Sequence, residues 1–188
     1  MPIQIGQPPG HDFDEPLGLL SDCHRRIEHF LHVLVVVDAE LAGGPPTPAH
    51  RDALEASLRY FTIAAPKHTA DDEESLFPRL RDSSDPAAAA AMMLVDRLEH
   101  DHDEADVHHA AVAVLVRRWL AEGGLQAGDS TELRERLAQL QVLYQRHISV
   151  EDQQLFPAAA RVLDRGQLRQ IAREMAARRQ IRSGAAPG

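Results

Sequence analysis

The chain has 188 residues, of which 20 are Lys or Arg and 29 are Asp or Glu, so its formal net charge is −9. This length suits one domain with a substantial core, and a hydrophobic fraction of 44% is typical of globular proteins. The acidic balance and the 4% aromatic content argue against a nucleic-acid partner, and the single cysteine excludes a disulfide scaffold. No apolar run is long enough to cross a bilayer and no signal-peptide pattern is present, so we expect no membrane association and a cytoplasmic location.

The hydrophobic pattern predicts four long helices that follow an extended N-terminal arm. Apolar residues recur at helical spacing, and Gly- or Pro-rich turns separate the stretches, which cover residues 17–41, 49–80, 85–122 and 129–157. Nothing alternates with the period of two that is typical of strands. We therefore predict an all-α, up-down-up-down four-helix bundle. Its expected parts are the arm at residues 1–15, the bundle at 16–165, and a basic helix with a tail at 166–188.

Local signals refine these helices. Asp85 followed by proline is a typical start for the third helix, and Asp129 with Glu132 three residues later predicts a capping box for the fourth. Pro66 and Pro157 lie inside helical stretches, which we expect to kink or end there because proline lacks a backbone N–H.

An internal repeat places similar residues in the two predicted hairpins. The pattern H-x-x-x-[D/E]-[D/E]-x-x-L-F-P occurs at residues 68–78 and again 79 residues later, at 147–157. In the first and third helices a histidine is again followed four residues later by a carboxylate. Residues four apart lie within about 40° of each other on a helix. The four histidines lie at similar distances along their helices from the turn of each hairpin. We therefore expect them to meet in one layer of the bundle.

Four histidines and four carboxylates in one buried layer predict a metal centre. Uncompensated burial would cost several kcal/mol per charge. Imidazole with carboxylate is typical of Fe, Mn or Zn sites, whereas Ca and Mg prefer oxygen. Four carboxylates balance two divalent cations. If these are two iron ions, oxidation to the ferric state leaves a charge of +2 that invites an oxo or hydroxo bridge, and Zn or Mn are possible substitutes. The candidate ligands are His24, Glu28, His68, Asp72, His102, Asp106, His147 and Glu151, with Glu73 as an alternative to Asp72.

Two further features leave alternatives open. His109 shares a face with His102 but lies about 10.5 Å further along the axis, which suits a place beside the site or on an outer face better than direct ligation. From residue 161 onward the chain carries seven Arg and two acids, including an i, i+4 stripe of Arg161, Arg165, Arg169 and Arg173. We expect this basic region to dock on the acidic bundle or to form a homodimer contact, rather than to bind nucleic acid or a membrane.

At these residues the sequence closely resembles the hemerythrin-like HHE cation-binding family, bacterial members in particular, over about residues 17–163. The landmarks are CHRRIEHFL, HTADDEESLFPRL, LEHDH and HISVEDQQLFP. The resemblance implies a four-helix bundle with a non-heme di-iron centre near its middle. It also implies that Glu151 is a bridging carboxylate and that the iron ligands include the four histidines at 24, 68, 102 and 147. Asp72 stands where the family usually has Glu.

The sequence departs from the oxygen carriers of that family, which have five histidines and two bridging carboxylates. Asp106 stands where their third helix has a second histidine, and Glu28 has the same offset in the first helix. A site richer in carboxylates should stabilise ferric iron. The resemblance therefore favours binding or sensing of a small diatomic ligand, peroxide or iron over reversible oxygen carriage. The alternative is a di-iron oxidoreductase with ferroxidase or peroxide-degrading activity, in which Asp71 or Glu73 moves protons.

Overall fold

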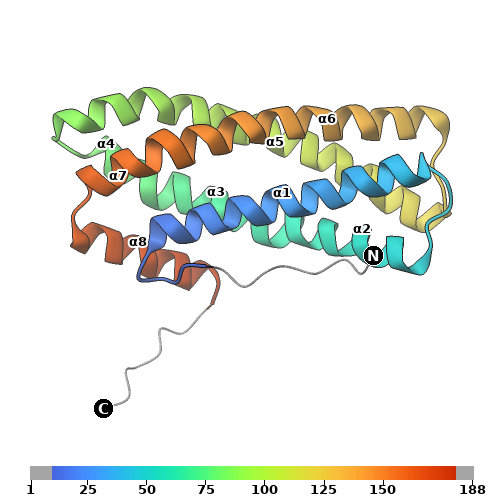
Figure 1. Ribbon diagram of the computed structural model, residues 1–188, viewed down its shortest axis with the longest axis horizontal. Helices are drawn as coiled ribbons and strands as arrows, with labels where there is room; N and C mark the ends of the chain where they lie inside the picture. The colour runs from blue at the N-terminus through green and yellow to red at the C-terminus, as the bar shows by residue number, and fades with distance from the viewer. Residues whose placement is uncertain (1–9, 181–188) are drawn as a thin grey trace, which may run out of the picture.

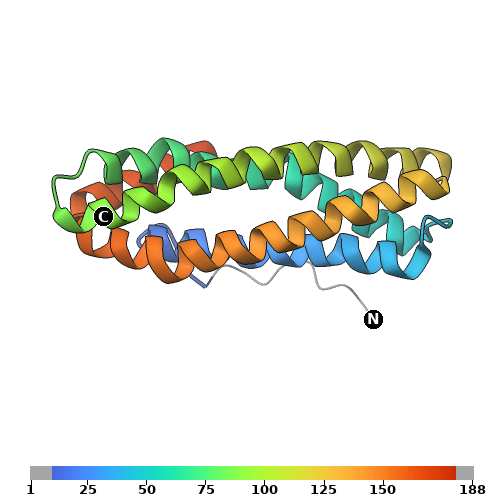
Figure 2. The ribbon, with the colours of Figure 1, turned by 90° about the horizontal axis from the view of Figure 1, so that it is seen from above.

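The computed structural model describes residues 10–180, and these residues form helices joined by short turns. Four long helical runs lie antiparallel in up-down-up-down order, which confirms the predicted all-α bundle (Figures 1 and 2). The first run is α1 (Pro16–Leu41) and the third is α5 (Pro86–Glu122). The second run consists of α2 (Pro48–Arg59), η1 (Tyr60–Ala64), α3 (Ala65–Asp71), η2 (Asp72–Leu76) and α4 (Phe77–Arg81). The fourth consists of α6 (Ala127–Val150), η3 (Glu151–Leu155) and α7 (Phe156–Val162).

The ends of α5 follow their local sequence, whereas the start of α6 does not. The Asp85 side chain accepts the backbone N–H of Ala87 at the start of α5, and Gly123 ends that helix with a φ of 74°. At the start of α6 no side chain caps the helix, so the predicted capping box is wrong. Asp129 instead accepts a hydrogen bond from Arg118 at 2.6 Å, which ties α6 to α5.

The segments η1, η2 and η3 are π turns, and each closes at a residue that precedes proline. In η2 the N–H of Phe77 bonds to the carbonyl of Asp72, five residues earlier, and Pro78 follows. The segments η1 and η3 close in the same way before Pro66 and Pro157. Proline offers no N–H to the carbonyl four residues before it and its ring crowds that carbonyl, so the preceding turn widens. The prolines therefore modify continuous helical runs without ending them.

The π turns change which residues face the core. Residues five apart differ by about 140° around a regular α-helix, whereas an i to i−5 bond aligns them. Asp72 and Phe77 are both 0% exposed, and their repeat equivalents Glu151 and Phe156 are 0% and 5% exposed. The widened turn thus lets a carboxylate and an aromatic ring point into the same interior.

Two apolar clusters fill the bundle, and the layer of histidines lies between them. Along α1, Leu20 belongs to one cluster and Ile27 to the other, with His24 between them. Along α5, Leu98 and Ala105 similarly flank His102. Each polar layer residue is therefore held by packed apolar side chains on both sides along its helix.

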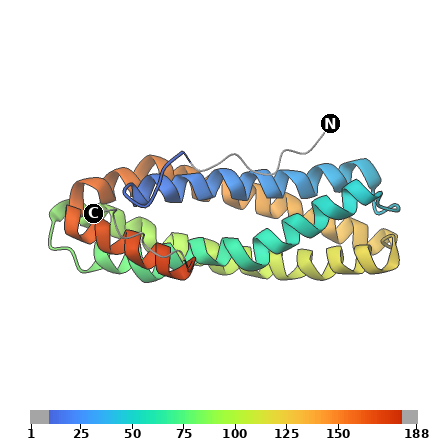
Figure 3. The ribbon, with the colours of Figure 1, turned by 90° about the horizontal axis from the view of Figure 1, so that it is seen from below.

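A further helix, α8 (Arg165–Arg178), packs against α1 and α3 on the outside of the bundle (Figures 1 and 3). It buries Ile171 and Met175 completely. At the other terminus, residues 10–15 turn back onto α1, where the backbone N–H of His11 donates to Asp22 at 2.7 Å. Residues 1–9 of the predicted arm and residues 181–188 of the predicted tail lie outside the described part. None of the described helices combines the length and apolar character needed to span a membrane.

Candidate metal centre

The four histidines of the predicted layer are buried and meet in two pairs. Their exposed fractions lie between 1% and 7%. The ring centroids of His24 and His68 are 4.8 Å apart, and those of His102 and His147 are 4.7 Å apart. Each pair joins one histidine from each helix of a hairpin, so the two hairpins contribute equivalent halves. The internal repeat of the sequence thus corresponds to two equivalent halves of the site.

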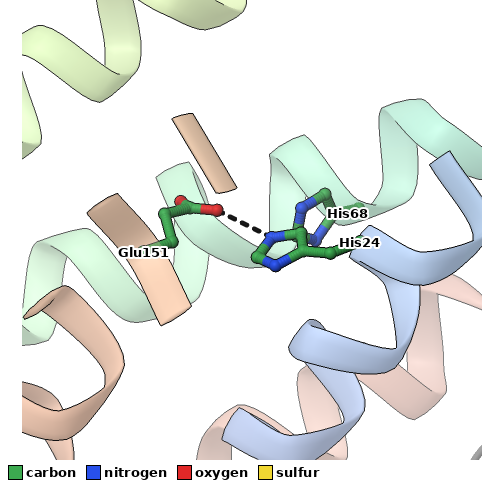
Figure 4. Close-up of side chains that lie close together, drawn as sticks. All are labelled: His24, His68 and Glu151. Carbon is green, nitrogen blue, oxygen red and sulfur yellow. Dashed lines mark hydrogen bonds and ion pairs between the residues drawn. The ribbon is translucent and has the colours of Figure 1, made fainter. Parts of the chain in front are cut away.

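Glu151 lies between the two pairs. One potential ligand atom each from His24, His68 and Glu151 lie within 4.8 Å of one another, and the same holds for His102, His147 and Glu151. The Glu151 Oε2 atom is 2.8 Å from His24 Nε2 and 3.3 Å from His147 Nε2. Figure 4 shows the carboxylate of Glu151 pointing at the His24 ring, with His68 behind it. One carboxylate therefore serves both halves.

Carboxylates outside the layer bind the far ring nitrogens of two histidines, and a third carboxylate lies near His147. Asp152 is 3.0 Å from His24 Nδ1, and Glu73 is 2.8 Å from His102 Nδ1. Asp101 lies 3.6 Å from the Nδ1 atom of His147, which is beyond hydrogen-bond distance. Such partners fix the ring orientation and leave Nε2 directed at the layer, which is the usual arrangement around histidine metal ligands.

The donor atoms fit a bound metal. Buried polar atoms normally have hydrogen-bond partners. In the described chain, both ring nitrogens of His68, Nε2 of His102, both oxygens of Asp72 and Oε1 of Glu151 are buried without one. Unpartnered imidazole nitrogens and carboxylate oxygens that face one interior are the donors that Fe, Mn and Zn accept. A cation at this position would satisfy them.

The two inner carboxyls are equally buried, but their neighbours shift their pKa values in opposite directions. Burial, with the charges of Glu151 and Asp71, raises the pKa of Asp72 well above its usual value. Burial also opposes ionisation of Glu151, but His147 and His24 outweigh it and hold the pKa of Glu151 well below the usual value. Against its own burial, the pKa of His147 rises to about 9, mainly because of Glu151. Glu151 with His147 thus forms an ion pair, while Asp72 prefers its proton.

The two halves are also equivalent in the aromatic rings that cover them. Phe156 stacks on His24 with a centroid distance of 5.5 Å, and Phe77 stacks on His102 at 6.2 Å. Each of these rings comes from the L-F-P end of the repeat and covers a histidine from the other hairpin. Phe77 and Phe156 therefore shield the polar layer from water at one end.

The family model of the hemerythrin HHE cation binding domain matches residues 15–159 of the sequence, which is most of the chain. The chain belongs to this family. An uncharacterized protein of Haemophilus influenzae is 30% identical to it over 171 residues, which cover 90% of this chain and 93% of that relative. The chain thus combines a cation-binding domain with buried His and Glu groups that could hold a metal ion.

Two candidate ligands of this HHE domain stand apart from the layer. Glu28 is exposed on α1 and belongs to neither group, which corrects its assignment as a ligand. The buried face of α1 is centred near Leu20, Ile27 and Leu31, so a residue four after His24 has turned away from it. Asp106 is also exposed, but it borders a cavity beside His102 and His147, and desolvation there raises its pKa.

Glu73 and Asp72 take different places in the HHE site. Glu73 is bound to the outer nitrogen of His102, so its carboxylate orients a histidine and does not replace Asp72 in the layer. Asp72 is fully buried, and its Oδ2 atom lies 3.4 Å from His68 Nδ1. The structure therefore brings Asp72 to the edge of the layer.

Sequence reasoning missed Asp101 and Asp152. A signal existed for Asp152, because the repeat aligns it with Glu73, and both hold a histidine of the other hairpin. No such signal existed for Asp101, because the repeat aligns it with Cys23. Asp101 lies 3.6 Å from His147 Nδ1, a distance similar to the 3.4 Å between Asp72 and His68 Nδ1.

The basic C-terminal helix reaches the edge of the HHE site. Arg178 and Arg179 bind the fully buried Asp71 at 2.9 and 2.6 Å. Arg79 of α4 binds Glu174 of α8 at 2.8 Å. The predicted intramolecular docking thus exists, but the contacts differ from those expected, because the stripe Arg161, Arg165, Arg169 and Arg173 is exposed.

Proposed function

We propose that this HHE protein binds two iron ions, one at each histidine pair, with Glu151 between them, and uses the centre to bind or sense oxygen, peroxide, nitric oxide or iron. The observation that carries the proposal is that two buried groups, each with two imidazoles, share one carboxylate. A shared carboxylate between two such groups is the arrangement expected of a dinuclear site. The symmetry of the halves supports equal roles for the two positions.

The buried charges also suit a centre of this kind. With Glu28 on the surface, the sequence-based balance of four carboxylates no longer applies, and Asp72 and Glu151 remain as the fully buried carboxyls facing the layer. When bound, iron would supply redox chemistry and open coordination positions for a small ligand. The protein contributes fixed imidazole donors, through the outer carboxylates, and a dry interior, through the stacked phenylalanines.

The surroundings favour binding over turnover. A catalytic site needs a free acid or base to move protons. Asp71 is engaged by two arginines and Glu73 by His102, so neither of the predicted shuttles is free. Asp106, at the edge of the cavity, is the group that favours the alternative, an oxidoreductase with ferroxidase or peroxide-degrading activity.

Metal analysis and optical spectroscopy test the proposal. Protein purified from iron-rich medium should contain about two iron ions per chain, and His68→Ala with His147→Ala should remove them. His32→Ala, at an exposed position of α1, is the matched control and should retain the iron. A spectrum that cycles reversibly between dithionite and air supports binding, whereas sustained peroxide consumption supports the alternative. Wild-type protein without iron, or a double variant with unchanged iron, would refute the di-iron assignment.

A further inference from the structure

Two cavities lie side by side next to the histidine layer. The inner one has a volume of about 20 Å³ and is bordered by His68, His102 and His147. The outer one has a volume of about 350 Å³ and lies between η1 and α5. Phe61 and His109 line both cavities, so these two rings form the partition between them.

The partition is a pair of stacked rings. The centroids of Phe61 and His109 are 4.3 Å apart, with an interplanar angle of 27°. His109 Nε2 lies 2.9 Å from the hydroxyl oxygen of Tyr144, a residue of α6. This contact fixes the orientation of the His109 ring. Phe61 packs edge-on against Tyr60 at 5.3 Å, and both belong to the π turn η1. Phe61 has no polar group, so packing contacts hold its side chain and no hydrogen bond has to break when the ring turns.

The outer cavity suits an uncharged molecule. Its walls include Leu34, Leu58, Val112 and Ala113, and the hydroxyl of Thr62 is occupied by a 2.7 Å bond to a backbone carbonyl. The charged residue of the lining, Arg117, is exposed to solvent, so the interior walls of the cavity are uncharged. Burial lowers the pKa of His109 to about 4, so its ring is uncharged at neutral pH. A wall of this kind disfavours hydrated ions. The inner cavity has about the volume of one water probe, which suits a molecule as small as a diatomic gas.

We propose that the outer cavity is the entrance through which a small uncharged ligand such as nitric oxide or dioxygen reaches the metal centre, and that the stacked Phe61 and His109 rings are its gate. This inference rests on the proposed function. It also gives a role to η1, the π turn that has no counterpart in the repeat, because that turn carries Phe61.

Rates of nitric oxide binding test the gate. In iron-loaded, reduced protein, Phe61→Ala should raise the association and dissociation rate constants of nitric oxide together by about tenfold, because a gate changes passage and leaves the bound state alone. Phe61→Trp should lower both. Val114→Trp, at an exposed position on the rim of the outer cavity, should also slow both without disturbing the core. Val142→Trp is the matched control, an exposed valine on α6 that lines neither cavity, and should leave the rates unchanged.

A second measurement does not depend on the metal. Xenon added under pressure to metal-free protein should occupy the outer cavity, detected by shifts of the methyl NMR signals of Leu58 and Val112, and Val114→Trp should reduce its occupancy. If wild-type protein lacks iron or binds no nitric oxide, the proposed function fails. If wild-type protein binds both, but rates in the Phe61 and Val114 variants stay within about twofold of the control, the gate is refuted and ligand enters elsewhere. Absence of xenon from the outer cavity would equally overturn it.

Discussion

The two halves of the repeat place equivalent residues at equivalent positions, but one carboxylate reaches the centre of the layer and the other stops at its edge. Glu151 lies 2.8 Å from His24 and 3.3 Å from His147. Asp72, the aligned residue, has two buried oxygens without hydrogen-bond partners. Both follow a histidine by four residues and both begin a π turn. The two side chains differ by one methylene group, which is about 1.5 Å of reach. The repeated backbone thus gives both residues equivalent positions, and the length of each side chain decides which atoms it contacts.

A second difference surrounds Asp72. Its neighbour Asp71 is aligned with Val150 in the other half, and Asp71 anchors α8 through two arginines. The charge of Asp71 adds to burial and to Glu151 in raising the pKa of Asp72. The half whose carboxylate stops at the edge of the layer is thus also the half against which α8 packs.

The largest expected effect separates the two carboxylates directly. Glu151→Gln keeps the shape but removes the charge shared by both histidine pairs, so bound iron should fall below about a tenth of the wild-type content. Asp72→Asn changes a side chain at the edge and should retain at least about half. Glu135→Gln, at an exposed position of α6, is the control, and metal analysis compares it with the two inner variants. Equal losses in the two inner variants would mean that Asp72 bridges as well as Glu151 does.

The outer carboxylates should behave alike, because there the symmetry is intact. Asp152→Asn and Glu73→Gln each release the Nδ1 atom of a buried histidine from its partner. Each change should weaken metal affinity by about 10- to 100-fold, measured by titration against a competing chelator. Loss in one variant only would show that the asymmetry of Asp72 and Glu151 extends to the outer contacts.

The sequence was sufficient for the helices and for the register of the four histidines, because both follow from helical periodicity and from the repeat. It was insufficient for Glu28, because a spacing of four places two residues near one face without saying where the centre of the buried face lies. Each π turn changes which face of the helix the later residues occupy. A proline in the sequence indicates where such a change can occur but not how large it is. Asp101 could not be found because its contact with His147 depends on the packing of α5 against α6.

Lengthening Asp72 should restore the missing symmetry. Asp72→Glu extends the carboxylate by about 1.5 Å toward the layer and recreates the residue of the other half. We expect metal affinity to rise by about tenfold in the same chelator titration, because a second carboxylate then joins the ligands. Val150→Asp, which copies Asp71 into the other half at a partly buried position, is the control for added charge without added reach. An unchanged or lower affinity in Asp72→Glu would show that packing around residue 72 opposes the longer side chain.

The smallest expected effect is on the stability of metal-free protein, and its sign differs between the halves. The pKa of Asp72 is raised on folding, so its contribution to stability is present below its unfolded pKa of about 3.9 and is lost as pH rises through the folded pKa. The pKa of Glu151 is lowered, so its contribution is present above about 4.3 and is lost as pH falls through the folded pKa.

Urea unfolding of chelator-treated protein between pH 3 and pH 7 measures this contrast. At pH 7, Asp72→Asn should be more stable than wild type by about 1 kcal/mol, because folding of the wild type must suppress the ionisation of Asp72 and the amide carries no such cost, and the advantage should vanish toward pH 3. Glu151→Gln should be less stable at pH 7 by a similar amount, with the deficit shrinking in acid, because protonation removes the same ion pair from wild type. Parallel curves for the two variants would show that Asp72 and Glu151 have the same charge in the folded protein. The two halves would then differ only in reach.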